Sequence, residues 1–147
     1  MKSRLETIGK LTAKNIPVNV MIAPVIPGLT SHEVPAIVKE VAKRGASSAA
    51  CVMVRLNGAV APIFADWAEK NYPDRAKKIL NQIAATHGGK LNDSRFGVRM
   101  KGEGKIAENI MAMFKLSKKR YMAGRSIPPL NTTAFRKVTH GQLNLFD

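Results

Sequence analysis

The chain has 147 residues, with 24 Lys and Arg against 10 Asp and Glu, so its formal net charge is +14. Apolar residues make up 45% of it, which is enough for a packed core and excludes a wholly disordered chain. The single cysteine, Cys51, excludes an intrachain disulfide and any cluster built from cysteines of this chain alone. No apolar run reaches the roughly 20 residues that span a bilayer, so the sequence predicts a soluble, cytoplasmic protein with no membrane partner.

The first 57 residues predict a helix followed by one β-α-β unit. Apolar residues at helical spacing predict a helix over 2–14, and β-branched apolar runs predict strands over 17–23 and 48–56. An apolar stripe predicts a helix over 34–44 between the two strands. A strand, helix and strand of these lengths give parallel strands joined by a right-handed crossover.

Thr30 and Glu33 have the spacing of a capping box, which predicts that their side chains close the first turn of this second helix. Asn15 is placed to stop the first helix, and Gly45 follows the basic end of the second.

Residues 58–123 predict a helical region. Ile63, Phe64 and Trp67 mark one helix, with Trp67 expected in the core, and Pro73 opens the next. A glycine-rich, charged loop over 88–104 (GGKLNDSRFGVRMKGEG) separates these helices from a last one, whose apolar residues run from Ile106 to Tyr121. Residues 124–147 are expected to be an extended tail.

Two strong strands are too few for a stable parallel sheet, because parallel sheets need both faces and both edges covered. The sequence therefore predicts an α/β fold that is a piece of a larger sheet or barrel. The remaining strands would lie upstream in the gene, or a second copy of the chain would cover the edges.

Two segments resemble one enzyme family. Residues 24–33 (PVIPGLTSHE) resemble the P-x-I-P-G-x-x-x-x-E segment of radical SAM enzymes, and the loop over 88–104 resembles the region after the barrel in their spore photoproduct lyase-like (DNA repair photolyase) group. The similarity runs from about Arg4 to Phe146. It implies the C-terminal fragment of a partial TIM-type barrel of a bacterial enzyme.

The resemblance also implies a cofactor set for the intact protein, S-adenosylmethionine and a 4Fe-4S cluster held by a C-x-x-x-C-x-x-C loop. This chain lacks that loop, and Cys51 is expected to be a small buried apolar residue, so the chain alone should bind neither cofactor. By position, Pro24, Ile26 and Gly28 match the segment that packs near the adenine of the cofactor. The alternative is a strand-ending turn that caps the next helix.

Positive charge is concentrated in residues 90–125, which hold 10 basic and 3 acidic residues. Such a field favours phosphate-bearing partners, although a solvated helix face would look the same. Glycines free backbone amides to face an anion, and guanidinium groups grip phosphate. The alternative for the loop is that Asp93–Arg pairs hold it internally. The candidate nucleic-acid or phosphate contacts are Arg95, Arg99, Lys101, Lys105, Lys118, Lys119 and Arg120.

The tail ends in a short docking motif. Residues 142–146 (QLNLF) resemble the Q-L-x-L-F pentapeptide by which bacterial DNA repair and replication proteins dock on the sliding clamp. Leu145 and Phe146 would fill an apolar pocket while Gln142 forms hydrogen bonds, and Leu143 completes the motif. The alternative is a segment that folds back onto the core.

Three compatible functions result. The chain is the C-terminal portion of a radical SAM enzyme acting on nucleic acid and inactive by itself, a non-catalytic nucleic-acid-binding module, or an adaptor on the sliding clamp. No catalytic residue is assigned. His32, His87 and His140 lack metal-ligand spacing, so they are expected to be structural or surface residues, and no metal ligand is assigned.

Overall fold

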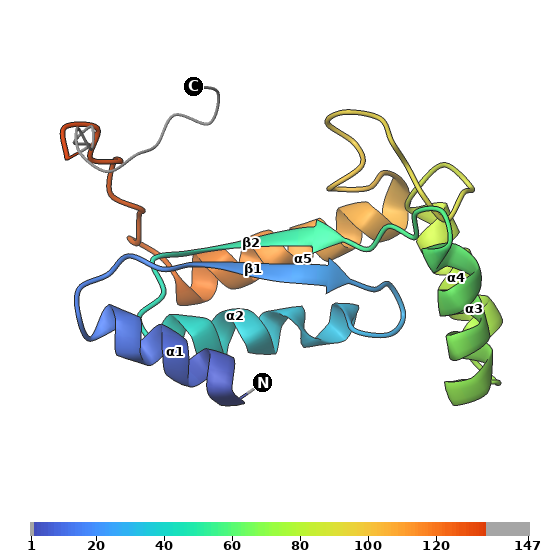
Figure 1. Ribbon diagram of the computed structural model, residues 1–147, viewed down its shortest axis with the longest axis horizontal. Coiled ribbons are helices and arrows are strands. Elements are labelled where there is room, and N and C mark those ends of the chain that lie inside the picture. The colour runs from blue at the N-terminus through green and yellow to red at the C-terminus, as the bar shows by residue number, and fades with distance from the viewer. Residues whose placement is uncertain (1, 135–147) are drawn as a thin grey trace, which may run out of the picture.

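The computed structural model describes residues 2–134 and has an α/β arrangement around a two-stranded parallel sheet (Figure 1). The elements in chain order are α1 (Lys2–Thr12), β1 (Asn19–Val25), the 3-10 turn η1 (Ser31–Glu33), α2 (Val34–Lys43), β2 (Ser48–Met53), α3 (Val60–Asn71), α4 (Ala76–Ala85) and α5 (Gly104–Tyr121). The parallel pairing of β1 with β2 confirms the predicted β-α-β unit. Within residues 2–134, none of the helices has the length and apolar character needed to cross a membrane.

One face of the sheet carries the main core. Alternate residues of the strands, such as Ile22 on β1 and its neighbour Cys51 on β2, point to this face and are buried. Three helices cover it: α1 through Ile8, α2 through a Val34–Val38–Val41 stripe, and α5 through a stripe centred on Ile110 and Phe114. Burial of this apolar surface is the main force that holds the β-α-β unit together.

Among residues 2–134 the opposite face of the sheet is only partly covered, and we call it the bare face. Met21 on β1 is 55% exposed, and its neighbour Ala50 on β2 is only half-buried, as is Val52. Within residues 2–134, no strand pairs with the second edge of β1. Parallel strands are normally covered on both faces, so this sheet presents a surface suited to further structure.

A second, smaller core lies beyond the carboxyl ends of the strands. It joins Val54 and Leu56, which follow β2, to Ile79 and Ile83 of α4, with Ile26 packed at its side. In Figure 1, α3 and α4 stand at this end of the sheet, and the loop over 88–103 rises above them. This end of the molecule is therefore built from segments far apart in the sequence.

Three local predictions need correction. The capping box is wrong, because the Thr30 hydroxyl accepts from the backbone N–H of Ile26 and no side-chain cap bond forms at the helix start. The second strand ends at Met53 rather than at residue 56. Trp67 is 40% exposed rather than in the core, and its ring lies beside two aromatic rings, 5.4 Å from Phe64 and 5.6 Å from Tyr72 between centroids.

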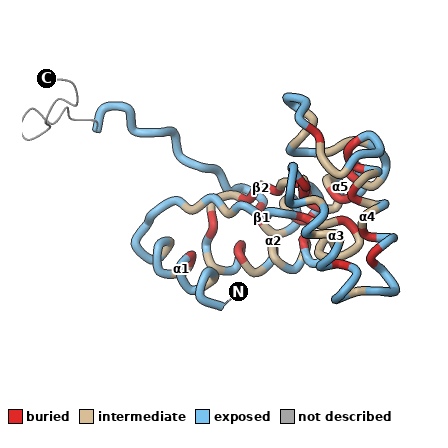
Figure 2. The backbone as a smooth tube through the Cα atoms, turned by 45° about the vertical axis from the view of Figure 1, so that its right-hand side comes forward, coloured by how far each residue is buried: buried red, intermediate tan, exposed pale blue. Residues whose placement is uncertain are grey.

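The first strand is Asn19–Val25 rather than 17–23 and includes Pro24, whereas two helix ends agree with the sequence. Asn15 has φ +56° just after α1, and Gly45 has φ +86° just after α2, which are the left-handed positions expected at helix ends. Residues 123–134 are exposed throughout and contain no helix or strand (Figure 2). The docking motif over 142–146 lies outside the described residues.

Candidate functional site at the carboxyl ends of the strands

The loop over 88–103 is fastened onto the segment that continues β2. The backbone N–H of Met53 donates to the carbonyl of Met100, and that of Leu56 donates to the carbonyl of Leu91, each at 3.0 Å. The two ends of the loop meet where the N–H of Glu103 donates to the carbonyl of Thr86, also at 3.0 Å. The loop is therefore a closed, fixed structure at the carboxyl end of the sheet.

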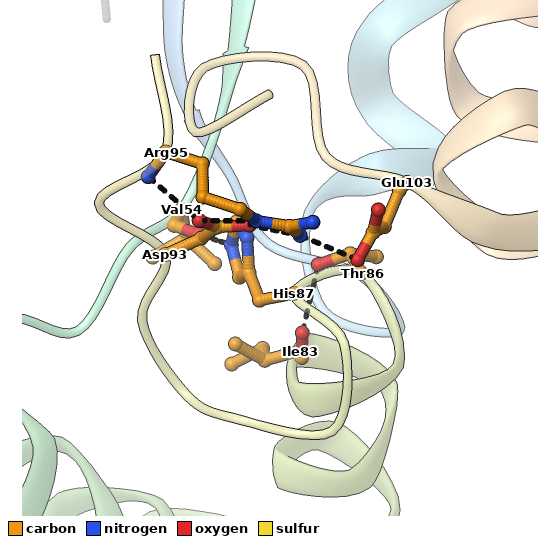
Figure 3. Close-up of polar contacts among 7 residues, drawn as sticks. All are labelled: Val54, Ile83, Thr86, His87, Asp93, Arg95 and Glu103. Atoms are coloured by element: carbon orange, nitrogen blue, oxygen red, sulfur yellow. Dashed lines mark hydrogen bonds and ion pairs between the residues drawn. The ribbon is translucent and has the colours of Figure 1, made fainter. Parts of the chain in front are cut away.

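An ion-pair network holds the loop in shape (Figure 3). The guanidinium of Arg95 lies between two carboxylates, with Nη2 at 2.6 Å from Asp93 Oδ2 and 2.6 Å from Glu103 Oε1. The backbone N–H of Arg95 also donates to Asp93 Oδ1 at 2.8 Å. The side chain of Asp93 is only 5% exposed, so this carboxylate is committed to the loop.

The same bonds set the ionisation of Asp93. The side-chain hydrogen bonds from Arg95, helped by the bond from its backbone N–H, lower the pKa of Asp93 to about 2. Both carboxylates raise the pKa of Arg95. Arg95 thus forms the internal Asp93–Arg pair that the sequence offered as the alternative to phosphate binding. The two carboxylates neutralise the charge of its guanidinium.

His87 is the buried histidine of this site. It is 2% exposed, and its Nε2 lies 2.7 Å from the carbonyl oxygen of Val54. Because a carbonyl only accepts, Nε2 carries a proton, and in the neutral ring Nδ1 is an acceptor. Nδ1 is buried and has no hydrogen-bond partner among residues 2–134.

A polar pocket of about 430 Å³ lies between His87 and the loop. Its wall includes Asn92, whose Oδ1 is a second buried acceptor that no described residue pairs. Lys90 and Ser94, both exposed, also line it. The site therefore combines a fixed ionic frame with two buried acceptors that have no partner among the described residues.

The tip of the loop presents an aromatic ring to solvent. Phe96 is 92% exposed, and the guanidinium carbon of Arg99 lies 6.0 Å from its centroid. An exposed phenylalanine ring gains almost no stabilisation from burial in the chain by itself. Proteins that bind single-stranded nucleic acid stack bases on such rings beside cationic side chains.

The other predicted cations are not brought into internal ion pairs. Within the described part of the chain no acidic group pairs with Arg99, Lys101, Lys105, Lys118, Lys119 or Arg120. The same holds for Lys115, which was not among the predicted contacts but lies on α5 with the last three, and we call these seven residues the unpaired cations. Lys101 and Lys115 line one groove of about 310 Å³ between the loop and α5. Arg125, by contrast, donates to the carbonyls of Ala42 and Ala46 at 2.8 and 2.9 Å and holds the end of α2.

The three residues matched to the adenine segment lie at different surfaces. Pro24 lines the groove beside β1, Ile26 packs on the second core, and Gly28 faces the side chain of Gln82. The Ile26 carbonyl accepts from the N–H groups of Leu29, Thr30 and Ser31, so the segment forms the strand-ending turn. These residues do not make a cofactor site by themselves, and an adenine contact stays a prediction.

The free edge of β1 borders a groove of about 460 Å³. Its walls are Leu5 and Ile8 of α1, Ile37 of α2 and the edge of β1 itself. Arg4 and Glu33 supply its charged groups. An apolar groove along an unpaired strand is the form of surface that accepts an added strand.

The residues present do not fit an iron–sulfur cluster. Cys51 is the only cysteine of the sequence, and it is buried with Sγ 3.4 Å from Met111 Sδ. Burial raises the pKa of its thiol, which disfavours the thiolate that a metal requires. Among residues 2–134 there is also no group of three His, Cys, Asp or Glu side chains placed to hold a metal ion.

Sequence reasoning did not single out the burial of His87, the unpaired oxygen of Asn92 or the exposure of Phe96. His87 was expected to be a structural or surface residue. Its burial and its Nε2 bond to Val54 agree with the structural alternative, while its buried Nδ1 has no partner among residues 2–134. An aromatic residue amid arginines and glycines was the signal that could have identified Phe96.

A scan against protein-family models, a search of curated proteins and a search of solved structures give no match for this chain. Its function must therefore be inferred from its residues and their geometry.

Proposed function

We propose that this chain forms the carboxyl-terminal part of a radical SAM enzyme, in which further strands join the free edge of β1. The observation that carries the proposal is the sheet, which has one covered face, one bare face and an apolar groove along an unpaired edge. Additional parallel strands would cover that edge, and closure into a partial barrel would enclose Met21, Ala50 and Val52.

The positions of the two family-like segments support the same proposal. The turn over 24–33 and the loop over 88–104 both lie at the carboxyl ends of the strands, where α/β barrels keep their functional groups. The cysteines for a cluster would come from the polypeptide that supplies the other strands, since Cys51 cannot supply them.

The test is to produce the full chain together with the polypeptide encoded upstream in the same reading frame. After anaerobic reconstitution with iron and sulfide, we expect the joined protein to bind iron, and we expect reductive cleavage of S-adenosylmethionine only when both parts are present. An upstream reading frame without C-x-x-x-C-x-x-C, or a joined protein that binds no iron, contradicts the proposal.

A second function, nucleic-acid binding, is supported by Phe96 and the unpaired cations. An exposed ring beside uncompensated positive charge offers a base-stacking surface and a track for phosphates. Fluorescence anisotropy with single-stranded DNA and RNA tests it. We expect affinity to fall steeply between about 50 and 200 mM salt, and absence of binding at low salt contradicts it.

A further inference from the structure

The helices α1 and α2 end with the same set of backbone hydrogen bonds. After α1, the N–H of Ile16 donates to the carbonyl of Leu11 at 3.1 Å, and after α2, the N–H of Ala46 donates to the carbonyl of Val41 at 3.1 Å. Within each of these bonds lies a second one, donated by a residue with positive φ. This nested pair is the Schellman motif. Both helices are therefore turned into the strands that follow them by the same local structure.

The two helices also lie side by side and run in the same direction (Figure 1). Their ends are joined, because the hydroxyl of Thr12 donates to the carbonyl of Arg44 at 2.7 Å. Nearer their starts, Leu5 of α1 and Ile37 of α2 line one shared cavity. The strands that follow them, β1 and β2, are paired in parallel. The segments α1–β1 and α2–β2 are therefore two copies of one helix–strand unit, placed next to each other.

This repetition indicates where a further strand belongs. In the second unit, α2 is preceded by β1 and connects it to β2. A strand placed before α1 in the same way would pair with the other edge of β1, where no strand lies within residues 2–134. The groove of about 460 Å³ borders that edge, and Leu5 and Ile8 of α1 form part of its apolar wall. The helix α1 therefore has the position of a crossover helix, with space for its first strand beside β1.

The outer edge of β2 is less open to an added strand. The N–H of Met53, at the end of β2, donates to the carbonyl of Met100 in the 88–103 loop at 3.0 Å. The chain after β2 also departs from the repeated unit, because α3 and α4 stand beyond the ends of the strands rather than beside α2 (Figure 1). Growth of the sheet is therefore favoured at β1.

The backbone of β1 has hydrogen-bonding groups suited to such a strand. The carbonyl of Val18 accepts from the N–H of Ser48 at 3.3 Å, so its backbone groups face β2. Neighbouring residues of a strand direct these groups to opposite sides, so those of Val20 also face β2, whereas those of Asn19 and Met21 face the free edge. The free edge therefore offers N–H and C=O groups that no described strand pairs.

We propose that the groove beside β1 takes a β-strand that directly precedes α1 in the same polypeptide. This strand runs parallel to β1, pairs with Asn19 and Met21, and crosses over to β1 through α1 in the right-handed sense. Its side chains toward α1 are apolar, because they cover Leu5 and Ile8. The inference rests on the proposed addition of strands to β1, and it identifies the first of them by its direction, its connection and its chemistry.

A second copy of the chain fits the same edge less well. Two copies related by a twofold axis would pair their β1 strands in opposite directions, which departs from the parallel pairing of β1 with β2. Each α1 would still have no strand to connect, and two chains of net charge +14 would be brought together. The repeated unit therefore favours a strand of the same polypeptide.

Amide hydrogen exchange measured by NMR tests the pairing directly. In the chain of 147 residues, the amides of Asn19 and Met21 should exchange freely, whereas that of Val20, which faces β2, should be protected. The comparison is the same chain extended by the polypeptide encoded directly upstream in the reading frame. There, Asn19 and Met21 should exchange at least about 100-fold more slowly and approach the rate of Val20.

Two substitutions on α1 separate this packing from general stability. Leu5 lines the groove, whereas Leu11, which is 36% exposed, lies on α1 outside it. In the extended chain, Leu5→Gln should speed exchange at Met21 about tenfold relative to Val20, because the added strand loses an apolar contact. Leu11→Gln is the matched control and should leave that ratio unchanged. Equal ratios for the two variants contradict the packing of the strand on α1.

Several results overturn the proposal. One is an upstream reading frame without an apolar strand directly before α1, and another is an extended chain in which Asn19 and Met21 exchange freely. Protection of these amides in the unextended chain that rises with protein concentration shows a second copy at the edge and also overturns it. The enzyme proposal fails separately, because a joined protein with protected amides that binds no iron contradicts radical SAM chemistry and leaves this strand in place.

Discussion

Asp93 is the buried carboxylate of the ion-pair network that holds the 88–103 loop. Its carboxylate accepts bonds from the backbone and the side chain of Arg95, and in turn it fixes the guanidinium that reaches Glu103. The fold lowers the pKa of Asp93 from its ordinary value of 3.8 to about 2. The ionised carboxylate therefore stabilises the folded chain fully at pH values above about 4, and this stabilisation is lost as the pH falls from about 4 to 2.

Asp93→Asn should therefore lower the free energy of unfolding at neutral pH, and the difference from the wild type should shrink to zero as pH falls through this window. Urea unfolding at several pH values measures it. Glu103→Gln is the control, since it leaves the Asp93–Arg95 bonds in place and should cost less. A difference that is independent of pH would contradict this account.

Gly28 combines a left-handed backbone with a crowded neighbour. It has φ +72°, and a Cβ there would collide with Oε1 of Gln82, whereas Gly97 has φ +83° with nothing near its Cβ position. Gly97→Ala should cost about 1–2 kcal/mol from backbone strain alone. Gly28→Ala should lower the free energy of unfolding by more than Gly97→Ala does. Adding Gln82→Ala to the Gly28→Ala variant should remove the extra loss. Equal unfolding free energies for the two single variants would rule out the collision.

At the scale of elements, the two faces of β1 should differ in how far a charged substitution lowers the free energy of unfolding. Met21 points to the bare face and Ile22, next in sequence, to the core. Met21→Asp should change the stability of the chain by less than about 1 kcal/mol. Ile22→Asp leaves a charge buried without a partner and should cost about 3–5 kcal/mol. Denaturant unfolding measures both.

Met21→Asp also tests how the sheet is completed. If further strands cover this face, the variant should fold normally and yet fail to associate with the polypeptide encoded upstream. Co-purification of the two parts provides the measurement, and Ser3→Asp on exposed α1 is the control. Unimpaired association would show that added structure does not reach the bare face.

The β-α-β unit could be predicted because its signals are local. The Val34–Val38–Val41 stripe and the apolar runs of the strands are periodic patterns within a few residues. The prediction that Trp67 lies in the core is wrong, because the apolar spacing along α3 indicates which residues share a helix face but not whether another element covers that face. The sequence predicted the site only as a basic loop, because its contacts join residues far apart in the chain. His87 and Val54 are 33 positions apart, and Arg125, which follows α5, reaches the end of α2.

For the whole molecule, the charge of +14 does not act evenly. Arg95 is neutralised by two carboxylates and Arg125 holds a helix end, so these two cations support the fold. The unpaired cations extend from the loop along α5, and Phe96 stands at the loop tip. In the proposed nucleic-acid binding, electrostatic attraction and base stacking would come from different residues, so experiments can separate them.

Strand binding should separate the two contributions through its salt dependence. Lys115→Gln removes a cation from the groove beside α5, so the slope of log K against log salt should lessen by about 0.7 for a single strand. Phe96→Ala should keep the slope and weaken binding by about 1–3 kcal/mol at every salt concentration, because stacking releases no counterions. Lys10→Gln on α1, outside the unpaired cations, should change neither quantity. If Phe96→Ala altered the slope while Lys115→Gln did not, the strand would lie elsewhere on the molecule, because the residue that changes the slope must touch the phosphates.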